Sequence, residues 1–377
     1  INKKNLDKIL DLDYKKKIIC CQSGVILKDL LDIILKKNLF IFSTPGTFKA
    51  TIGGLVATDA HSKNTSNNFF SNTIISIKIL TIKNEIIICT KNINKDLFYS
   101  TIGGFGLTGV ILEVTFKLQK IPSKFLIKKV IRFESFQEMI SIMIKNRSKY
   151  NYIYTHHNTN KNKLSSGSVI MAKFTKNNFN KNFEFKNKIR IYNPLKIPII
   201  NRFSIFFFNL LVHDLRFFRD PKSNKIISIY DFFYPLEKIK NWEKLYGYKR
   251  FFEFQVYVNK NNILKFLNEI SCNENLYKSF SFICSTKFID KSKGFFSNTN
   301  NNSYNFAIDL IENKFLHTNY LKLLKIAENN GGIINLHKED YIKKKNLDLK
   351  KIPNFKIFKK FINLDLVNSN FARRFIK

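Results

Sequence analysis

The sequence has 377 residues, of which 44% are hydrophobic, and a formal net charge of +36. That length favours two packed domains, and the apolar content with only seven prolines excludes a disordered chain. The 64 lysines and arginines are spread along the whole chain and form no basic arm or stripe. We therefore expect no nucleic acid as a partner, whereas weak attraction to anionic lipid or to a phosphate-bearing substrate stays open.

Neither a metal site nor a membrane span is predicted. The five scattered cysteines include no C-x-x-C pair, and His156 and His157 lack partners at metal-ligand spacing. The most apolar stretch, residues 197–212, contains Asn201, Arg202 and Asn209, which would be costly in lipid. We expect a cytoplasmic protein or one peripheral at the membrane, and export is not assessable because the N-terminus is expected to be absent.

The first part of the chain is rich in glycine, because eight of the thirteen glycines fall within the first 109 residues. Glycine permits close approach of the backbone to a ligand, so this part is expected to hold a bulky cofactor. Hydrophobic periodicity predicts, in chain order, a strand at 17–21, a helix at 25–37, a strand pair at 73–82 and 85–90, and a strand at 110–118. In the last strand, Val110, Leu112, Val114, Phe116 and Leu118 are expected to share one face.

The remainder of the chain is poorer in glycine and alternates predicted strands with predicted helices. Strands are predicted at 130–133, 150–154, 168–174, 227–233, 251–258, 280–288 and 305–311. Helices are predicted at 135–145, 236–245, 261–270 and 313–329, and Gly331 and Gly332 are typical of a helix C-cap. Many strands with few β-α-β units indicate a mostly antiparallel sheet covered by helices.

Residues 104–109 match the spelling G-x-G-x-x-G, which in a dinucleotide-binding fold must open a helix. Here Gly109 leads into the predicted strand 110–118, so the Rossmann interpretation fails on its context. A second motif contains Pro45-Gly46-Thr47, then Thr51 to Gly54, then residues 59–64 with His61. By itself this motif fits two interpretations equally: a backbone cradle for phosphate, or a tight turn followed by a capped helix.

The order of these motifs carries a family resemblance. P-G-T-x(3)-T-I-G-G-x(6)-H, followed by a strand pair and G-G-x-G-x-T-G, resembles the FAD domain of the vanillyl-alcohol oxidase superfamily, also called PCMH-type. Within it, D-x-H-x-K-N (residues 59–64), Phe254-Gln255, Asn305 with Asp309, Lys338 and Ala372-Arg373-Arg374 resemble the decaprenylphosphoryl-β-D-ribose 2′-oxidase family. The resemblance covers nearly the whole chain.

The resemblance implies an α+β fold of two domains and an FAD-dependent oxidoreductase acting on CH-OH groups. It places the FAD-binding domain at 1–122, a substrate domain with a large antiparallel sheet at 123–332, and a C-terminal segment returning to the FAD domain at 333–377. The R-G-x-x-Y-G-D-like first FAD loop of the family should precede Ile1. We therefore expect a chain truncated within its FAD domain, with poor affinity for FAD because backbone donors to the pyrophosphate are lost.

Site residues are implied position by position. FAD contacts are implied for Gly46, Thr51, Ile52, Gly53, Gly54, Thr58, Asp59, Ala60, His61, Val110 and Asn335, the last standing where the family has a tyrosine. Catalytic positions are Lys338 and His61, and substrate positions are Lys63, Gln255, Lys287 and Asn305. Lys338 is expected to bind or polarise the reacting oxygen, or to act as the base if burial and Lys63 depress its pKa.

Three functions compete at this point. The first is oxidation of a polyprenylphosphoryl pentose to a 2′-keto sugar, as half of an epimerisation that a separate short-chain reductase completes. The second is oxidation of a free alditol, aldonolactone or hydroxy acid by another enzyme of the superfamily. The third, from a different class, is a non-catalytic basic binding protein on the same scaffold.

Overall fold

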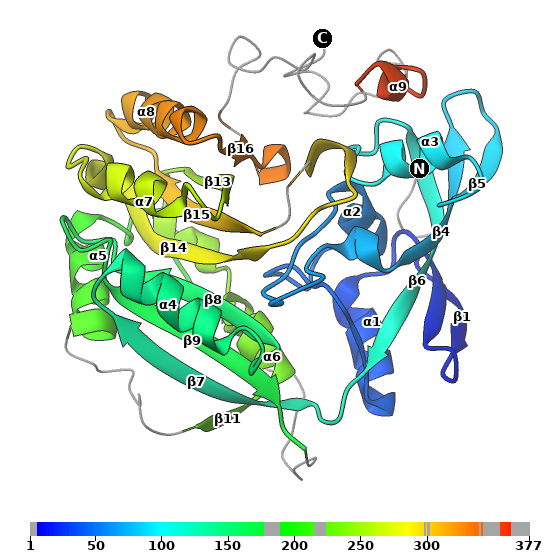
Figure 1. The fold of residues 1–377 in the computed structure, drawn as a ribbon, viewed down its shortest axis with the longest axis horizontal. Helices are drawn as coiled ribbons and strands as arrows, with labels where there is room; N and C mark the ends of the chain where they lie inside the picture. The colour runs from blue at the N-terminus through cyan, green and yellow to red at the C-terminus, as the bar shows by residue number, and fades with distance from the viewer. Residues whose placement is uncertain are drawn as a thin grey trace.

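The computed structural model describes residues 6–176, 189–214, 224–297, 299, 302–338, 341 and 355–362. Two antiparallel sheets organise these residues (Figure 1). The smaller sheet is built from residues up to 120, and the larger sheet begins at residue 125. The fold is thus the predicted α+β arrangement. The part built on the smaller sheet, up to residue 120, is the one expected to bind FAD, and we call it the FAD-binding part; the other part contains the large antiparallel sheet.

The smaller sheet is arranged around one long strand, β6 (Gly109–Lys120). Strands β2 (Ile18–Gln22), β3 (Leu39–Ile41) and β4 (Ile74–Thr81) pair with it, and β1 (Ile9–Asp13) and β5 (Ile86–Thr90) extend the two sides. Helices α1 (Leu27–Ile34), α2 (Ile52–Ala57) and α3 (Lys95–Thr101) connect the strands. Val114, Phe116 and Leu118 are buried in its core, as their alternation predicts.

One detail of β6 differs from the prediction. The β6–β4 pairing shifts register between Lys78 and Ile79, so the strand changes face at a bulge. Ile111 is buried instead of Val110, which is exposed at 36%. The expectation that Val110 and Leu112 share the face of Val114 is therefore wrong.

The larger sheet has eight strands in the order β11-β7-β9-β8-β14-β15-β13-β16. They are β7 (Phe125–Phe133), β8 (Tyr152–His157), β9 (Gly167–Phe174), β11 (Lys225–Ser228), β13 (Phe251–Asn259), β14 (Phe280–Ile289), β15 (Ser303–Ile311) and β16 (Ile333–Ile334). Every pairing in this sheet is antiparallel. Helices α4 (Phe136–Asn146), α7 (Ile263–Ser271) and α8 (Leu316–Asn329) cover one face (Figure 1), as predicted.

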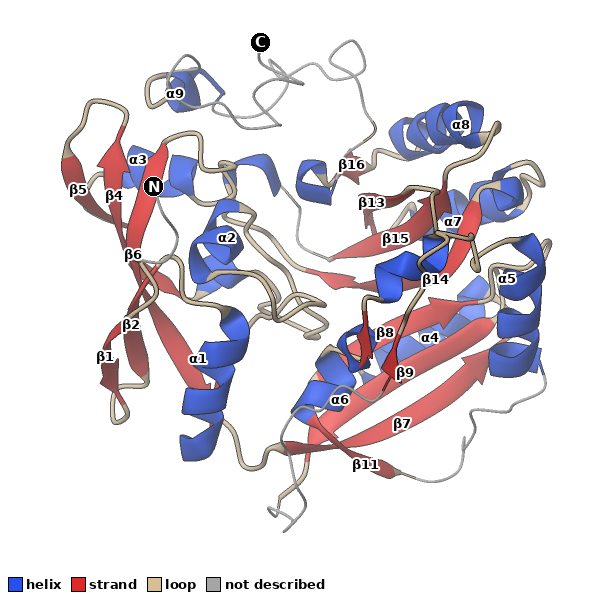
Figure 2. Ribbon diagram, turned by 180° about the vertical axis from the view of Figure 1, so that it is seen from behind, coloured by secondary structure: helices blue, strands red, loops and turns tan. Residues whose placement is uncertain are grey.

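The other face of the large sheet is turned toward the FAD-binding part and is lined by different elements. α6 (Ile229–Phe233) packs near β7 and β11, and α5 (Arg202–Asn209), continued by a π-helical turn Leu210–Asp214, packs on β14. In both Figure 1 and Figure 2, α5 lies at the end of the molecule remote from β1. None of the helices in the described ranges combines the length and the hydropathy that crossing a bilayer requires.

Two predicted elements are wrong. Residues 227–233 form the end of β11 and then α6, because Ser228 caps a helix by accepting a hydrogen bond from the Asp231 N–H. Residues 236–245 form two 3₁₀ turns (Leu236–Lys238 and Trp242–Tyr246) around the short strand β12 (Ile239–Lys240). Asn241 takes the left-handed conformation (φ 60°) and prevents a continuous helix.

The C-terminal part belongs to both halves of the molecule. β16 pairs with β13, so the predicted boundary after residue 332 falls within the large sheet and is placed too early. The 3₁₀ turn Leu336–Lys338 lies against β13, and α9 (Phe355–Lys359) contacts α3. The motif at residues 372–374 and most of the predicted C-terminal segment lie outside the described residues.

Candidate active site

Polar side chains from three adjacent strands form one row on the uncovered face of the large sheet. In the strand register, Asn305 of β15 lies opposite both Lys287 of β14 and Tyr257 of β13. Gln255 lies opposite Ala307. Directly paired residues project to the same face, so these side chains lie together. Three of the four predicted substrate residues, Gln255, Lys287 and Asn305, are thereby assembled on one surface.

His61 joins this row from the FAD-binding part. Its Nδ1 atom is 2.8 Å from Lys287 Nζ, and its Nε2 atom is 3.3 Å from Gln255 Oε1. Burial, followed by the positive charges of Lys287 and Lys338, holds the pKa of His61 well below its usual range. The imidazole is therefore neutral, accepting from Lys287 at Nδ1 and donating to Gln255 at Nε2.

Lys63 follows His61 by two residues in the sequence but points to a different environment. Its Nζ atom donates to the carbonyl oxygens of Phe232 (3.1 Å) and Phe233 (3.4 Å). It also lies 4.4 Å from the centre of the Tyr154 ring, within cation–π range. Burial lowers the pKa of Lys63 to about 7. Within the described residues, no carboxylate forms an ion pair with this ammonium group.

Lys287 is the second buried lysine with a lowered pKa. Burial, and then the charge of Lys63, lowers its pKa to about 7, while the more distant carboxylate of Glu253 opposes this shift. Two buried lysines with displaced pKa values therefore lie on one side of the site. A bound anion would restore the charged form of the lysine that it contacts.

Lys338 has a different electrostatic environment from Lys63 and Lys287. Its Nζ atom is 3.2 Å from Glu253 Oε2, and its side chain is 49% exposed. The Glu253 carboxylate raises the pKa of Lys338 above its ordinary value. Lys338 was expected to act as a base only if its pKa were lowered, and this condition is not met. Its proximity to His61 and Gln255 still suits binding of a reacting oxygen.

Two carboxyl groups beside Lys338 were not predicted as site residues. Glu253 and Asp309 are direct partners in the β13–β15 register, and Glu253 also accepts a hydrogen bond from Gln255 Nε2. Burial, and then the charge of Glu253, raises the pKa of Asp309 well above its usual range. The protonated form of Asp309 is thus favoured, and Glu253 is the counter-ion of Lys338. The signals in the sequence were Asp309 in the family resemblance and the spacing of Glu253, two residues before Gln255 on one strand.

Asn335 and Asn305 were expected to touch ligands, and the structure gives them different environments. The Asn335 side chain donates from Nδ2 to Gln255 Oε1 (2.7 Å), and its backbone N–H donates to the Gln255 carbonyl (2.9 Å). Asn335 therefore positions Gln255. Asn305 is completely buried, and neither atom of its amide has a hydrogen-bond partner in the described residues. A buried amide without partners is costly, so Asn305 suits a polar ligand.

Apart from Val110 on β6 and Asn335 beside β13, the predicted FAD residues form a connected set around α2. Thr51 caps this helix, its Oγ1 accepting from Gly54 N–H, and Gly53 N–H donates to the Ser23 carbonyl (2.7 Å). A Cβ atom at Gly53 would lie 2.8 Å from the Ser23 Cβ, so this glycine is needed for packing. The capped-helix interpretation is therefore correct here, and the N–H groups of Gly53 and Gly54 are not the free phosphate donors that the cradle requires.

Other members of the set leave room for a ligand. At Gly46 a Cβ atom would meet nothing within 4 Å, so the backbone there borders open space. Ile52 is buried, and Thr58 closes α2 by donating from Oγ1 to the Gly54 carbonyl (2.8 Å). The glycine loop is tied to the end of α2, since Gly103 N–H donates to Val56 O (2.8 Å) and Phe105 N–H to Ala57 O (2.9 Å). The two predicted cofactor motifs thus lie side by side.

Asp59 has a structural role that was not predicted. Its carboxylate accepts hydrogen bonds from Ser71 and from two groups that follow β14, Ser292 Oγ (2.6 Å) and Gly294 N–H (3.0 Å). A Cβ atom at Gly294 would collide with Asp59. Asp59 therefore joins the FAD-binding part to the large sheet, and its neighbour Ala60 donates from its N–H to the Leu55 carbonyl.

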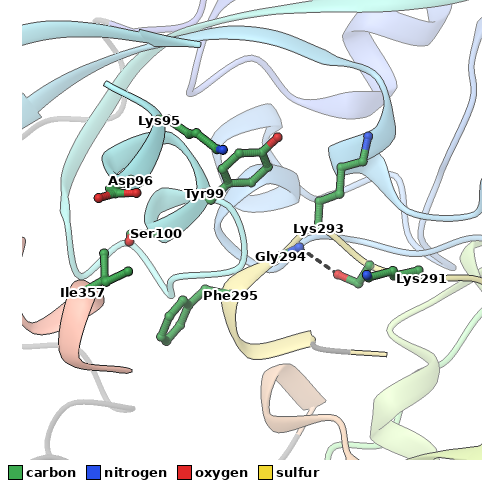
Figure 3. A pocket seen from close by; sticks show the side chains of 10 residues that line it. Lys95, Asp96, Tyr99, Ser100, Lys291, Lys293, Gly294, Phe295 and Ile357 are labelled. Atoms are coloured by element: carbon green, nitrogen blue, oxygen red, sulfur yellow. Dashed lines mark hydrogen bonds between the residues drawn. The ribbon is translucent and has the colours of Figure 1, made fainter. Parts of the chain in front are cut away.

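A separate cavity of about 420 Å³ lies beyond this junction (Figure 3). It is lined by residues of α3, by the segment after β14 and by Ile357, and includes Lys95, Lys293 and Tyr99. It contains none of the predicted site residues. The row that contains Lys287 and Asn305 therefore remains the candidate active site.

Comparison with known proteins agrees with this assembly. Residues 1–90 match the family model described as FAD binding domain, which indicates FAD as the cofactor of this chain. The chain is 26% identical to the decaprenylphosphoryl-beta-D-ribose oxidase of Mycolicibacterium smegmatis over 67% of its own length and 57% of the relative. It is 30% identical to L-galactono-1,4-lactone dehydrogenase 2, mitochondrial, of Oryza sativa subsp. japonica, covering 30% of this chain and 20% of the relative. It is 25% identical to L-gulonolactone oxidase of Scyliorhinus torazame, covering 31% of this chain and 26% of the relative.

The residues present fit a flavin. The open backbone at Gly46 lies next to the α2 region, and His61 connects that region to the polar row. The unpaired amide of Asn305 and the cationic groups of Lys63 and Lys287 suit a ligand that brings hydrogen-bonding atoms and negative charge.

Proposed function

We propose that the protein oxidises a secondary alcohol of a phosphate-bearing sugar to a ketone with FAD, and that a polyprenylphosphoryl pentose is its substrate. The observation that carries this proposal is the pair of buried lysines, Lys63 and Lys287, which have no ion-pair partner among the described residues and lie beside the FAD-binding part. A phosphodiester supplies a counter-ion for Lys63, whereas Lys287 keeps the neutral amine that can accept a proton. The similarity to the decaprenylphosphoryl-beta-D-ribose oxidase, over 57% of that protein, supports the same substrate class.

In the proposed reaction the alcohol loses a hydride from its carbon and a proton from its oxygen. FAD supplies the two-electron acceptor for the hydride that leaves the alcohol carbon. Lys338, kept charged by Glu253, donates a hydrogen bond to the alcohol oxygen and stabilises the charge that develops there. The hydroxyl proton passes to the neutral amine of Lys287, whose pKa of about 7 suits a general base. The C=O bond forms as the C–H and O–H bonds break.

His61 acts through Lys287 and Gln255 in this scheme. Its neutral imidazole accepts a hydrogen bond from the ammonium form of Lys287 and keeps the Nζ atom in place after proton transfer. Gln255, fixed by Asn335 and Glu253, orients the opposite side of the ring. The Asn305 amide would hydrogen-bond a sugar hydroxyl or a polar edge of the flavin. The keto sugar would then be the substrate of a separate reductase.

A second candidate function is oxidation of a free sugar acid lactone or alditol. It is favoured by the relatives named L-galactono-1,4-lactone dehydrogenase 2 and L-gulonolactone oxidase, which match about 30% of this chain. These substrates carry no phosphate, so they leave the charge of Lys63 unexplained.

The test is anaerobic mixing of the FAD-loaded protein with a short-chain polyprenylphosphoryl ribose, with free ribose and with an aldonolactone. We expect bleaching of the flavin absorbance by the phosphoryl sugar alone, with a keto sugar as the product by mass spectrometry. Equal bleaching by an aldonolactone would favour the second candidate. A flavin spectrum that none of the three compounds changes would favour the non-catalytic binding protein.

A further inference from the structure

An apolar surface projects from the outer side of α5 and from the segment before it. We call it the aromatic patch; it consists of Tyr192, Leu195, Ile197, Phe203, Phe206 and Phe207. Tyr192 is 82% exposed, Leu195 79% and Phe203 73%. With Ile199, seven large apolar side chains are exposed within sixteen residues, which is unusual for a surface that faces only water, and such clusters mark interaction sites.

The inner side of α5 fixes this orientation. Ile205 and Asn209 are buried, and the Arg202 guanidinium donates to the Phe280 carbonyl (3.0 Å). Phe208 packs on Phe282 with ring centres 4.8 Å apart. Because these contacts occupy one side of the helix, Phe203, Phe206 and Phe207 project to the other side. Figures 1 and 2 agree that this end of the molecule is the one farthest from β1, so the smaller sheet does not cover the patch.

The charge within the segment that carries the aromatic patch has one sign. Residues 189–213 contain Arg190, Lys196 and Arg202 and no acidic residue. Lys196 is part of a turn whose carbonyl accepts from Tyr248 N–H (2.8 Å), and Tyr248 is itself exposed. Aromatic side chains among cationic groups are suited to the interface of a bilayer with anionic headgroups, where rings lie at the acyl boundary and lysines meet phosphates.

We propose that the aromatic patch docks the protein on an anionic membrane surface. Phe203 and Phe206 enter the headgroup region, and Arg190 and Lys196 bind lipid phosphates. Tyr192, Leu195 and Phe203 are each more than 70% exposed, so the patch fits a deformable lipid surface better than a folded protein partner. The overall charge of +36 adds a long-range attraction of the same sign.

The position of the patch gives docking a consequence for the active site. On the inner side of the same element, His213 Nε2 lies 3.0 Å from His156 Nδ1 on β8. His156 is two residues from Tyr154, whose ring lies against Lys63. One layer of secondary structure therefore separates the docking surface from the lysine side of the site. A lipid-linked sugar could reach that side without leaving the interface; this step alone rests on the proposed function.

The test is flotation of the protein with phosphatidylcholine vesicles and with vesicles in which about a third of the lipid is phosphatidylglycerol. We expect binding to the anionic vesicles, weakened by high salt, and little binding to the neutral ones. A variant with Phe203→Ser and Phe206→Ser should bind about tenfold or more weakly, because two apolar rings no longer leave water. Lys196→Gln should weaken binding by a smaller factor.

The matched control is a variant with Ile86→Ser and Ile88→Ser, which removes two exposed apolar side chains from β5 in the smaller sheet. It should bind as the unchanged protein does, and circular dichroism should show all variants folded. Equal binding by the Phe203→Ser, Phe206→Ser variant would overturn the proposal. So would a dimer that this variant alone dissociates, since the patch would then cover a second copy. The assay requires no turnover, so its failure and that of the oxidase reaction are distinguishable.

Discussion

The two sides of the active site place lysines in opposite electrostatic environments. On the β13 side, Lys338 has the carboxylate of Glu253 at 3.2 Å, and its pKa is raised. On the β8–β14 side, Lys63 and Lys287 have carbonyl, imidazole and ring partners, and their pKa values fall to about 7. A lysine with a carboxylate stays a cation and can polarise an oxygen; a buried lysine without one can bind an anion or accept a proton.

The largest effect is expected from Lys338→Met. If the charge of Lys338 stabilises the reacting oxygen, kcat/KM should fall by about 10²–10³-fold while bound flavin is retained. Stopped-flow bleaching of the flavin measures the reductive step directly. Lys322→Met, on the exposed surface of α8, is the matched control and should be unchanged. Normal flavin reduction in the Lys338→Met variant would remove Lys338 from the mechanism.

Substitution of Lys287 tests the β8–β14 side of the site. Its neutral amine is the proton acceptor, so kcat should rise as the pH increases through about 7, where the ammonium form loses its proton. Lys287→Met should lower kcat by about 10²-fold and abolish this pH dependence. A rise near pH 7 that survives in the variant would show that another group is the base.

Lys63 should act on binding and not on the chemical step. Lys63→Met is expected to raise KM for the phosphoryl sugar by about tenfold, with kcat unchanged, since one charge-assisted contact is lost in both ground and transition states. For the unmodified protein, KM should also rise with pH above about 7, because the cationic form of Lys63 is then lost. An equal loss with an uncharged polyol would show that Lys63 supports the fold instead of the phosphate.

The contrast between the two sides was only partly predictable. Periodicity predicted the β4–β5 pair and the strands β13, β14 and β15, because their apolar residues alternate regularly. It failed at residues 227–233, where Tyr230, Phe232 and Phe233 are all buried, and a run buried on all sides has no helical or strand period.

The properties of the site residues were also only partly predictable from the sequence. The family resemblance selected Lys63, Lys287 and Lys338, and the structure brings them to one region. Burial lowers the pKa of Lys63 and Lys287, whereas the Glu253 carboxylate raises that of Lys338, and no motif includes Glu253 with Asp309. The depressed pKa proposed for Lys338 belongs instead to its two neighbours for this reason.

The smallest effect is a gain of stability. Asn305 is fully buried in β15 with both amide atoms unpaired, so Asn305→Leu should raise the free energy of unfolding by about 1 kcal/mol. The same change should lower turnover, because the amide no longer contacts the ligand. Urea unfolding at constant m-value measures the first effect, and flavin reduction measures the second.

Asn319→Leu is the matched control for this trade-off. Asn319 is also buried, but its Nδ2 atom donates to Asn275 O and to Ser279 Oγ, both at 2.8 Å. Its replacement should therefore lower the free energy of unfolding by about 1–2 kcal/mol. If both variants lose the same stability, the Asn305 amide has partners in solution and is no reserve for a ligand. Changes of opposite sign in the free energy of unfolding would establish that Asn305 destabilises β15 and is retained for ligand binding. Asn305 pairs with Lys287 across β14 and β15.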